Sequence, residues 1–455
     1  MAESPSRKPN IIFFFTDQQR HDSTGVHGNP LELTPNFDRF AQQGTHLYNC
    51  FTSQPVCGPS RACLQSGQYA TTTGCYRNGI PLPQSTKALA HYFNDAGYHT
   101  GYIGKWHLAA KEHIGAVPEE ERGGYQYWLG ANLLEFTSGA YDLNLFNNEN
   151  EEVELPGYRV DAMTDAAIRY IDAQKDNPFF LFMSFLEPHH QNHLDDYPPP
   201  TGYRERYASR WTPPDLAALG GSTQQHLAGY WGMVKRLDEA FGRLLDALKS
   251  LGLLNNTIVV FTSDHGNHFK TRNGEYKRSC HESSVRVPCA ISGPGFDSGG
   301  QIRKLISLLD LPPTLLDAAG IAVPEQMQGR SILPLVQREK LDWPEEVFIQ
   351  ISESQVGRAV RTGRWKYGVD APDKDGWEDM NSDTYVEQYL YDLESDPYEL
   401  FNLIDLESHQ GVTAVMRERL KRRMLEAGEK EPIILPCPML KTADQRKVSE
   451  QEAHL

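Results

Sequence analysis

The chain has 455 residues, which is enough for one large and one small domain. Its formal net charge of −16 argues against a surface that binds nucleic acid, because such a surface would repel phosphates. An anionic substrate is not excluded, since a local cluster of Arg, Lys and a metal ion can override the overall negative field.

Apolar runs are short throughout the sequence. The longest, such as residues 179–186, have strand length and fall far below the ~20 residues of a membrane-spanning helix. The apolar run at residues 11–15 is too short for the core of a signal peptide. We therefore expect no membrane association and a cytoplasmic protein, or a periplasmic or secreted one if a signal has been removed. The seven cysteines are odd in number and lack zinc-site spacing, so no disulfide framework is predicted.

In chain order, apolar runs alternate with amphipathic segments. The apolar runs are typical of strands buried on both faces, and they cover residues 10–17, 98–104, 177–186 and 256–263. The amphipathic segments have helical spacing and cover residues 34–44, 86–96, 159–173 and 226–251. In the first helix we expect Thr34 to cap, Pro35 to take the first turn and Gly44 to end it. This alternation predicts an α/β fold with a large, mostly parallel sheet flanked by helices.

Two long stretches lack clear periodicity. Residues 111–157 are polar and rich in Gly and Asn, and residues 194–221 are rich in Pro, Tyr and Arg. We predict that both are surface excursions that shape a substrate mouth. After about residue 340 the pattern changes to short strand-like runs and a basic amphipathic helix at 413–427. We therefore expect the chain to divide into a large α/β domain, residues 1–340, and a smaller C-terminal α+β subdomain, residues 341–455, with a short antiparallel sheet and a helix.

Each of the four predicted strands ends in polar, ionisable residues. They are Asp17 with Gln18, Lys105 with His107, His189 with His190, and Asp264 with His265. A single Asp at such a place is more often the cap of the next turn. In open α/β sheets, however, ligands bind outside the carboxyl ends of the strands, so four such ends should line one site. Carboxylates, an amide oxygen and an imidazole suit Ca²⁺ or Mg²⁺ better than zinc, while Lys and His can neutralise an oxyanion and move protons.

Residues 57–67 read CGPSRACLQSG, a thiol, a turn-forming pair, a hydroxyl and a guanidinium at the start of a predicted helix. This places Cys57 and Arg61 about one helical turn apart, with Ser60 between them as a hydrogen-bond partner, and a helix N-terminus there favours an anion. A lone cysteine before a helix is usually only a buried residue. This segment, however, resembles the signature of the type I sulfatases of the alkaline phosphatase superfamily, Cys-x-Pro-Ser-Arg with a terminal Gly. In that family the cysteine is oxidised to formylglycine.

The resemblance covers nearly the whole chain and implies a metal site. The implied ligands are Asp17, Gln18, Cys57, Asp264 and His265. The family usually has a second aspartate where this chain has Gln18, so the site carries one negative charge less. Ca²⁺ is the expected cation, with Mg²⁺ as the alternative.

The resemblance also implies the catalytic residues, which are Cys57, Arg61, Lys105, His107, His189 and Lys277. The last is placed by residues 277–288, which have the length of the family's Lys-to-Arg-x-Pro segment. In the implied mechanism one hydroxyl of hydrated formylglycine attacks sulfur, while the arginine, both lysines and the cation offset charge on the sulfuryl oxygens. His189 protonates the leaving alcohol. His107 takes a proton from the second hydroxyl, so that sulfate leaves and the aldehyde returns.

Three functions stay open at this point. The first is removal of sulfate from a small molecule or glycan, most plausibly a sulfated sugar, because residues 123–146 and 195–211 contain aromatic and Arg side chains suited to carbohydrate. It requires a formylglycine-generating maturase as partner. The second is hydrolysis of a phosphonate monoester or phosphodiester, which the same superfamily performs with the same nucleophile. The third is a non-catalytic binding protein, which is disfavoured because none of the expected lysines or ligands is missing. The oligomeric state is left open.

Overall fold

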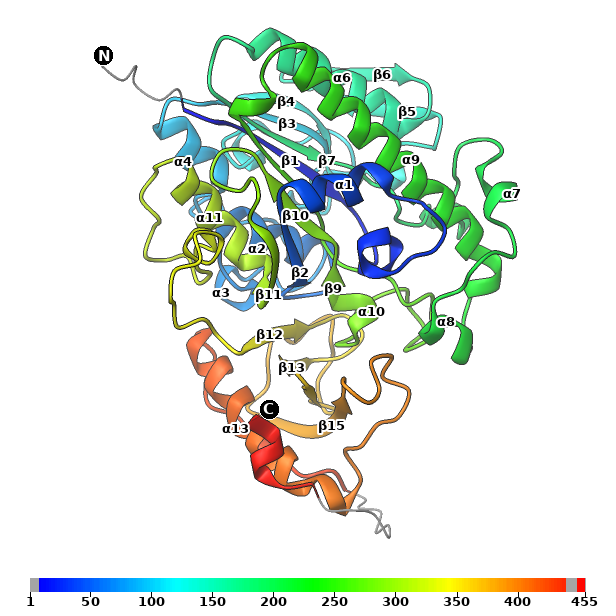
Figure 1. The fold of residues 1–455 in the computed structure, drawn as a ribbon, viewed down its shortest axis with the longest axis vertical. Coiled ribbons are helices and arrows are strands. Elements are labelled where there is room, and N and C mark those ends of the chain that lie inside the picture. Colours follow the sequence, from blue (N-terminus) through cyan, green and yellow to red (C-terminus); the bar gives the residue numbers. More distant parts are fainter. Residues whose placement is uncertain (1–7, 439–447, 455) are drawn as a thin grey trace.

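The computed structural model describes residues 8–438 and 448–454. The expectation about a signal peptide also rests on the polar composition of residues 1–10, of which residues 1–7 lie outside the described residues. Within the described part, a large sheet with its helices lies above a smaller sheet near the C-terminus (Figure 1). No helix of these two ranges is long and apolar enough to cross a lipid bilayer.

The large sheet contains eleven strands. Ten of them follow the order β11 (Gly300–Ser307), β2 (Thr45–Phe51), β10 (Cys289–Ser292), β8 (Thr257–Ser263), β1 (Asn10–Thr16), β7 (Phe179–Ser184), β3 (His99–Lys105), β4 (Tyr127–Ala131), β5 (Asp142–Phe146) and β6 (Glu152–Pro156), and β9 (Arg286–Val287) pairs with β2. The central strands β8, β1, β7, β3 and β4 are parallel, whereas β10, β5 and β6 run antiparallel to their neighbours. The predicted large, mostly parallel sheet is confirmed.

Strand β1 shows why the central strands read as continuous apolar runs. Ile11, Phe13 and Phe15 belong to the core on one face of the sheet, and Ile12 and Phe14 belong to the core on the other. All five side chains are fully buried. Since each such burial is worth about 1.5–3 kcal/mol, both faces of the strand favour the interior.

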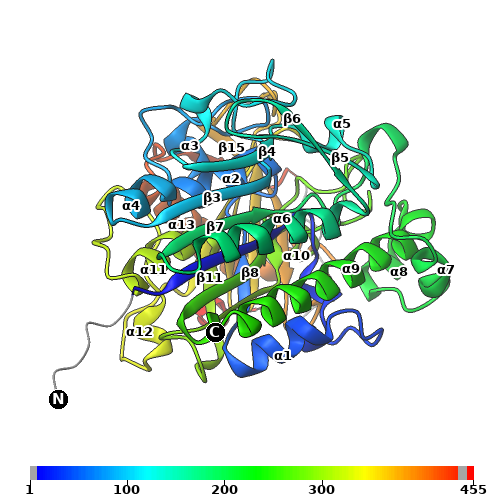
Figure 2. The ribbon, with the colours of Figure 1, turned by 90° about the horizontal axis from the view of Figure 1, so that it is seen from above.

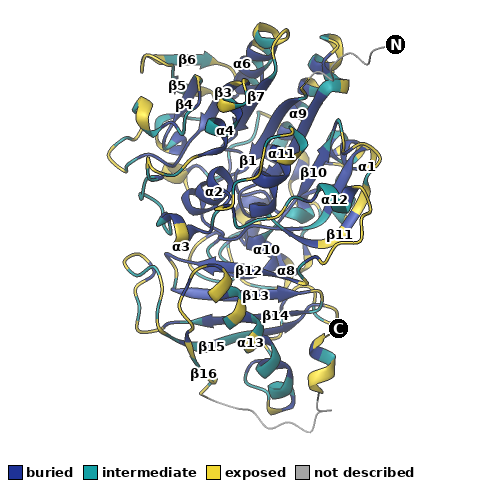
Figure 3. Cartoon of the chain, turned by 90° about the vertical axis from the view of Figure 1, so that its left-hand side faces the viewer, coloured by how far each residue is buried: buried dark blue, intermediate teal, exposed yellow. Residues whose placement is uncertain are grey.

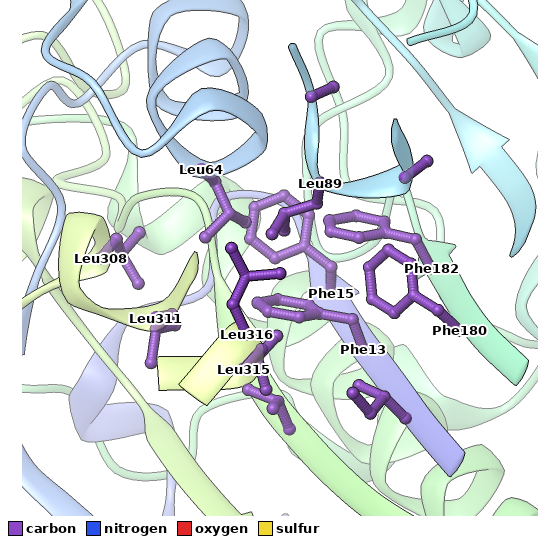
Figure 4. Packing of buried hydrophobic residues seen from close by; sticks show 14 of the residues in the cluster. Phe13, Phe15, Leu64, Leu89, Phe180, Phe182, Leu308, Leu311, Leu315 and Leu316 are labelled. Carbon is purple, nitrogen blue, oxygen red and sulfur yellow. The ribbon is translucent and has the colours of Figure 1, made fainter. Parts of the chain in front are cut away.

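Helices cover both faces of this sheet (Figure 2). One face carries α2 (Cys57–Ser66), α4 (Leu89–Asp95) and α11 (Leu311–Ala318), and the other carries α1 (Pro35–Gln43), α6 (Arg159–Gln174) and α9 (Thr223–Ser250). Figure 4 shows Phe13 and Phe15 of β1 packed against Phe182 of β7 and Leu64 of α2. The shorter helices are α3 (Ala70–Thr73), α5 (Leu134–Thr137), α7 (Tyr203–Tyr207), α8 (Pro214–Ala218), α10 (Glu282–Val285) and α12 (Leu333–Val336).

The prediction of a surface excursion over residues 111–157 is wrong. This stretch contributes β4, β5, β6 and α5, and β4 pairs in parallel with β3. Strands β5 and β6 form a hairpin at the sheet edge, and no residue of β6 is fully buried. Both strands alternate polar and apolar residues, DLNLF and EVELP, with Leu143 and Leu145 buried, so the prediction missed a period-two signal among Gly- and Asn-rich neighbours. Residues 194–221, also predicted as loop, contain the short helices α7 and α8.

The predicted ends of α1 are confirmed in position, with Thr34 before the helix, Pro35 in its first turn and Gly44 after it, but the capping bond expected of Thr34 is absent. Thr34 precedes the helix, but its hydroxyl accepts from the Gly25 N–H at 3.0 Å and makes no capping bond. Instead the Asp238 carboxylate of α9 accepts from the backbone N–H of Asn36 at 3.1 Å and of Phe37 at 2.8 Å. A distant acid therefore satisfies the helix N-terminus.

The smaller sheet has the order β12 (Glu346–Ile351), β13 (Gly357–Thr362), β14 (Trp365–Asp370), β15 (Thr384–Asp392) and β16 (Ile433–Leu435). It is antiparallel except for the last pair, and α13 (Gln410–Glu426) packs on it. Strands β12 and β13 are buried where the two sheets meet (Figure 3). The smaller C-terminal α+β part of the predicted fold is thus present, and the division at residue 340 stays a proposal.

Candidate active site

The ends of β1, β3, β7 and β8 and the start of α2 meet at one edge of the large sheet. The residues predicted from the sequence lie there in one buried cluster, which comprises Asp17, Gln18, Cys57, Arg61, Lys105, His107, His189, Asp264, His265 and Lys277. Their exposed fractions run from 0% for Asp17 to 8% for His107. The parallel topology therefore brings together side chains that are up to 260 positions apart, as the distance from Asp17 to Lys277 in the sequence shows.

Cys57 is the first residue of α2, and the next residue must be small. A Cβ on Gly58 would lie 2.9 Å from Asn78 Oδ1 and 3.4 Å from the His107 carbonyl oxygen. Asn78 Oδ1 accepts from the Gly58 N–H at 2.9 Å, so it satisfies one of the free N–H groups of the helix N-terminus. Glycine thus lets the nucleophile helix approach the loop that carries His107.

The thiol of Cys57 contacts a lysine, a histidine and a carboxylate. Its Sγ is 2.8 Å from Lys277 Nζ, 3.3 Å from His265 Nε2 and 3.6 Å from an Asp17 carboxylate oxygen. Burial opposes ionisation of the thiol, but Lys105, Lys277 and His265 together hold the pKa of Cys57 well below its usual value. Such a position is typical of a reactive cysteine rather than of a structural one.

Arg61 orients the two acidic side chains of the cluster. One terminal nitrogen of its guanidinium lies 3.0 Å from Asp17 and 3.3 Å from Asp264. The other donates to the Lys105 carbonyl oxygen at 2.9 Å and to the Ser184 hydroxyl at 2.6 Å. The terminal nitrogens of this guanidinium are therefore engaged by the protein itself.

The sequence-based expectation for Ser60 is wrong. Its hydroxyl does not bridge Cys57 and Arg61, because it donates to the Asp264 carbonyl oxygen at 2.8 Å and lies 3.0 Å from the Thr52 hydroxyl. It therefore ties α2 to the end of β8.

A group of four residues can hold a metal ion. One ligand atom each from Asp17, Cys57, Asp264 and His265 lies within 4.8 Å of all the others. The His265 Nδ1 is 3.0 Å from the Gly266 carbonyl oxygen, so Nδ1 carries the proton and the lone pair of Nε2 faces the cluster. Burial and the neighbouring Asp17 charge raise the pKa of Asp264, a repulsion that a cation would relieve.

Gln18 adds an independent indication of the same site. Its side-chain oxygen and nitrogen are both buried, and neither finds a hydrogen-bond partner among the described residues. Buried amides are nearly always paired, and Gln18 follows Asp17 in the chain and donates its backbone N–H to Asp264 at 3.0 Å, so its orphaned amide fits a ligand that binds an ion through its oxygen. The donor set present in this chain therefore fits a divalent cation.

Two of the predicted site residues have left-handed backbones. The φ angle is +68° for Gln18 and +61° for His107, a conformation that costs a non-glycine residue about 1–3 kcal/mol. Tyr230 of α9 holds the first turn, because its hydroxyl donates to the Gln18 carbonyl oxygen at 2.9 Å and accepts from the Arg20 N–H at 2.8 Å. From the sequence Tyr230 was only a member of an apolar helix face.

Lys277 connects Cys57 to a histidine. Its Nζ lies 3.1 Å from His189 Nε2, and the His189 Nδ1 lies 2.6 Å from the His190 carbonyl oxygen. Nδ1 therefore donates and Nε2 accepts from the lysine. Burial and then the Lys277 charge lower the pKa of His189. His190 stacks on this ring at 4.4 Å, and it is the His189 ring that contacts Lys277, so His189 is the histidine that faces the cluster.

Two acidic residues near the site were not found from the sequence. Glu135 of α5 lies 3.1 Å from Lys105 Nζ, and no periodic pattern marked the stretch that carries it. Glu353 of the smaller sheet region accepts from the Asn78 N–H at 2.7 Å and pairs with Arg278 at 2.5 Å. The C-terminal part thus supports both the start of α2 and the segment of Lys277, a role that only long-range contacts reveal.

Solved structures with this fold span nearly the whole chain. The structure of yidJ from Bacteroides fragilis aligns with a TM-score of 0.82 and 27% identity, over 94% of this chain and 98% of that one. The phosphonate monoester hydrolase of Agrobacterium radiobacter aligns with a TM-score of 0.72 and 22% identity, over 92% of this chain and 96% of that one. The second likeness shows a shared fold alone.

Sequence comparison gives the family. The Ulvan-active sulfatase of Formosa agariphila is 29% identical, over 93% of this chain and 82% of that protein. The N-acetylglucosamine-6-O-sulfatase of Bacteroides thetaiotaomicron is 27% identical, over 88% and 83%. The family model described as N-sulphoglucosamine sulphohydrolase, C-terminal, matches residues 274–426, and the model described as Sulfatase matches residues 9–321. The chain therefore belongs to the sulfatase family and is a sulfuric ester hydrolase with the alkaline-phosphatase-like fold.

Proposed function

We propose that this protein removes sulfate from a sulfated carbohydrate, with formylglycine formed from Cys57 as the nucleophile and a divalent cation beside it. The observation that carries the proposal is the position of Cys57. Its sulfur lies 2.8 Å from Lys277 Nζ and belongs to the same group of ligand atoms as Asp17, Asp264 and His265. Nucleophile, cation and sulfate-binding lysine therefore meet at one atom.

The cation would be held by residue 57 together with Asp17, Gln18, Asp264 and His265. Because most of these donors are oxygens, Ca²⁺ is preferred, with Mg²⁺ as the alternative. When bound, the cation lowers the pKa of a hydroxyl on residue 57 and offsets negative charge on the ester. A formylglycine-generating maturase must first act on Cys57, and the hydrated aldehyde then carries two hydroxyls, one to attack sulfur and one whose proton is removed to expel sulfate.

The other side chains have separate roles in this proposal. Lys277 and Lys105 neutralise the sulfuryl oxygens as the S–O bond to the alcohol breaks. In its imidazolium form His189 gives the Nε2 proton to the leaving alcohol, and the ring then returns to the neutral form in which Nε2 accepts from Lys277 at 3.1 Å. His107 takes the proton of the second hydroxyl. Arg61 acts by orienting the carboxylates, because its terminal nitrogens are already engaged.

A sugar substrate is supported by the name of one relative and by exposed aromatic side chains in residues 123–146. One relative is named for N-acetylglucosamine. Within residues 123–146, Phe136 and Tyr141 have exposed fractions of 56% and 52%. Aromatic side chains at the surface are suited to the apolar faces of sugar rings.

The test is a comparison of kcat/KM on matched 4-nitrophenyl sulfate, phosphodiester and phosphonate esters, together with a panel of sulfated mono- and disaccharides. We expect a sulfated sugar to exceed every phosphorus ester by at least ~100-fold, about 3 kcal/mol of transition-state binding. The second candidate function, hydrolysis of phosphonate monoesters or phosphodiesters, is favoured by the shared fold with such an enzyme. A preference for phosphorus esters with no sulfated sugar turned over would replace the first proposal by the second.

A further inference from the structure

Glu135 is a buried acid in a site for an anionic substrate. It lies on α5, which follows β4 and packs against β5 (Figure 2). Its side chain is only 4% exposed, and Oε1 lies 3.1 Å from Lys105 Nζ, which also contacts Asp17 at 2.9 Å. A third carboxylate here weakens the attraction of the site for sulfate, so its presence calls for a separate explanation.

The second oxygen of this carboxylate lacks a partner. Oε2 of Glu135 is buried, and no donor among residues 8–438 and 448–454 reaches it. Burial opposes ionisation, but Lys105, His107 and His189 together hold the pKa of Glu135 below its usual value, so the group is an anion and only accepts. A buried charged acceptor without a donor is costly, and in a native protein such a group is expected to have a function.

The surroundings fix Glu135 in place rather than letting it swing to solvent. Gln191 Nε2 donates to the Glu135 carbonyl oxygen at 2.7 Å and to the Ser138 carbonyl oxygen at 3.0 Å. Arg159 donates to the Gln191 side chain at 3.2 Å and pairs with Glu187 at 2.8 Å. Gln191, two residues after His189, thus ties the backbone of the Glu135 segment to the segment that carries His189.

Neither the cation nor the sulfate group fits as the partner of Glu135 Oε2. The metal-binding group takes its ligand atoms from Asp17, Cys57, Asp264 and His265, and Glu135 is not among them. A sulfate ester at neutral pH has only acceptor oxygens and would be repelled by the carboxylate. A donor on the alcohol side of the substrate, close to the ester, would satisfy this oxygen.

We propose that Glu135 is a specificity-determining residue whose Oε2 accepts a hydrogen bond from a hydroxyl of the substrate beside the sulfate ester. This rests on the proposed function and narrows its substrate class to sulfate esters with a free donor next to the sulfated carbon. Lys105 then contacts Asp17, binds the sulfuryl oxygens and holds Glu135 at the distance of a neighbouring substituent. An ammonium group in the same place would use the same chemistry.

The experiment compares three alkyl esters, cyclohexyl sulfate, trans-2-hydroxycyclohexyl sulfate and trans-2-aminocyclohexyl sulfate, with 4-nitrophenyl sulfate as a probe without a donor. Sulfate release is measured for the mature wild-type protein, for Glu135→Ala and for Glu135→Gln, which keeps the side-chain shape. We expect wild type to prefer an ester with a donor over cyclohexyl sulfate by about tenfold or more, and Glu135→Ala to abolish that preference. Preference for the amino ester over the hydroxy ester would identify the donor as an ammonium group.

The ratio between the esters separates substrate contact from a structural role. Loss of the Glu135 contact to Lys105 weakens turnover of all the esters equally, whereas loss of a substrate contact affects only those with a donor. Asp142 is an exposed carboxylate on β5, the strand that α5 packs against. Asp142→Asn is therefore the matched control and should leave the ratio of turnover between the donor esters and cyclohexyl sulfate unchanged. The inference is overturned if wild type shows no advantage for either donor ester, whether both are turned over slowly or not at all, or if both Glu135 variants retain the advantage. Absence of sulfate release from every probe, 4-nitrophenyl sulfate included, would instead contradict the proposed function.

Discussion

Replacement of His189 by alanine should separate proton donation from the other steps of the reaction. His189 Nε2 lies 3.1 Å from Lys277 Nζ, which in turn lies 2.8 Å from the sulfur of Cys57. If this imidazole protonates the leaving alcohol, the decrease in kcat/KM caused by His189→Ala should depend strongly on the leaving group. A nitrophenolate leaves without a proton, whereas a sugar alkoxide does not.

The magnitude follows from the size of general acid catalysis. A positioned acid contributes about 10²–10⁴-fold, which is about 2.7–5.4 kcal/mol at ~1.36 kcal/mol per decade. We expect His189→Ala to lose that much in kcat/KM on a sulfated sugar and less than about tenfold on 4-nitrophenyl sulfate. The substitution also deprives Lys277 of one acceptor, but that change is common to both substrates and cancels in their ratio.

The assay is sulfate release from both substrates under conditions where kcat/KM is measured directly. His190→Ala is the control. The His190 ring stacks on His189 at 4.4 Å, but it is the backbone carbonyl oxygen of His190 that accepts the hydrogen bond from His189, and the substitution keeps that oxygen. It should change the ratio by less than about threefold. Equal losses on both substrates in His189→Ala would refute the assignment of the acid and make His190 the next candidate.

Three further predictions concern the nucleophile, the cation and the fold. Cys57→Ala should abolish turnover, and peptide mass spectrometry of active protein should show an aldehyde or its hydrate at residue 57; undiminished activity of the variant would remove the basis of the site. Chelation should abolish activity, and calorimetric titration should show that Asp264→Asn weakens Ca²⁺ binding more than Gln18→Ala, because only the first removes a charge; full turnover of metal-free protein would contradict this. Asp238→Ala leaves the Asn36 and Phe37 N–H groups without their acceptor and should destabilise the protein by about 1–3 kcal/mol in urea unfolding, whereas the exposed Asp246→Ala on the same helix should not; equal midpoints for the two variants would show that the cap is dispensable.

Local residue patterns predict much of the architecture. The run at residues 10–17 predicts a strand buried on both faces, and β1 has Phe13 in one core and Phe14 in the other. The polar residues that end each strand predict a shared edge, since parallel strands place all their carboxyl ends on the same side. The order of Cys57 and Arg61 likewise predicts one helical turn between them, because α2 begins at Cys57.

Other features depend on groups that are distant in the chain. The hairpin of β5 and β6 has the two-residue alternation of a strand, but its place in the large sheet depends on β4, which offers an edge for pairing. Thr34 looks like a cap, but Asp238, more than 200 residues away, takes that role. Glu135 enters the site because α5 packs against β5 and against the segment that follows His189, which brings its side chain to Lys105.

The sequence by itself thus determined which segments are buried, which residue types end them, and hence the fold class and the chemistry available at one edge of the sheet. The tertiary structure alone decided which partner each polar group finds: Arg61 for both carboxylates, Tyr230 for the Gln18 turn, and no donor within the described chain for Glu135 Oε2. The physical reason is that burial patterns are local properties of a strand or helix. A hydrogen bond or an ion pair instead requires two groups within about 3 Å, and for residues far apart in the sequence only the packed fold sets that distance.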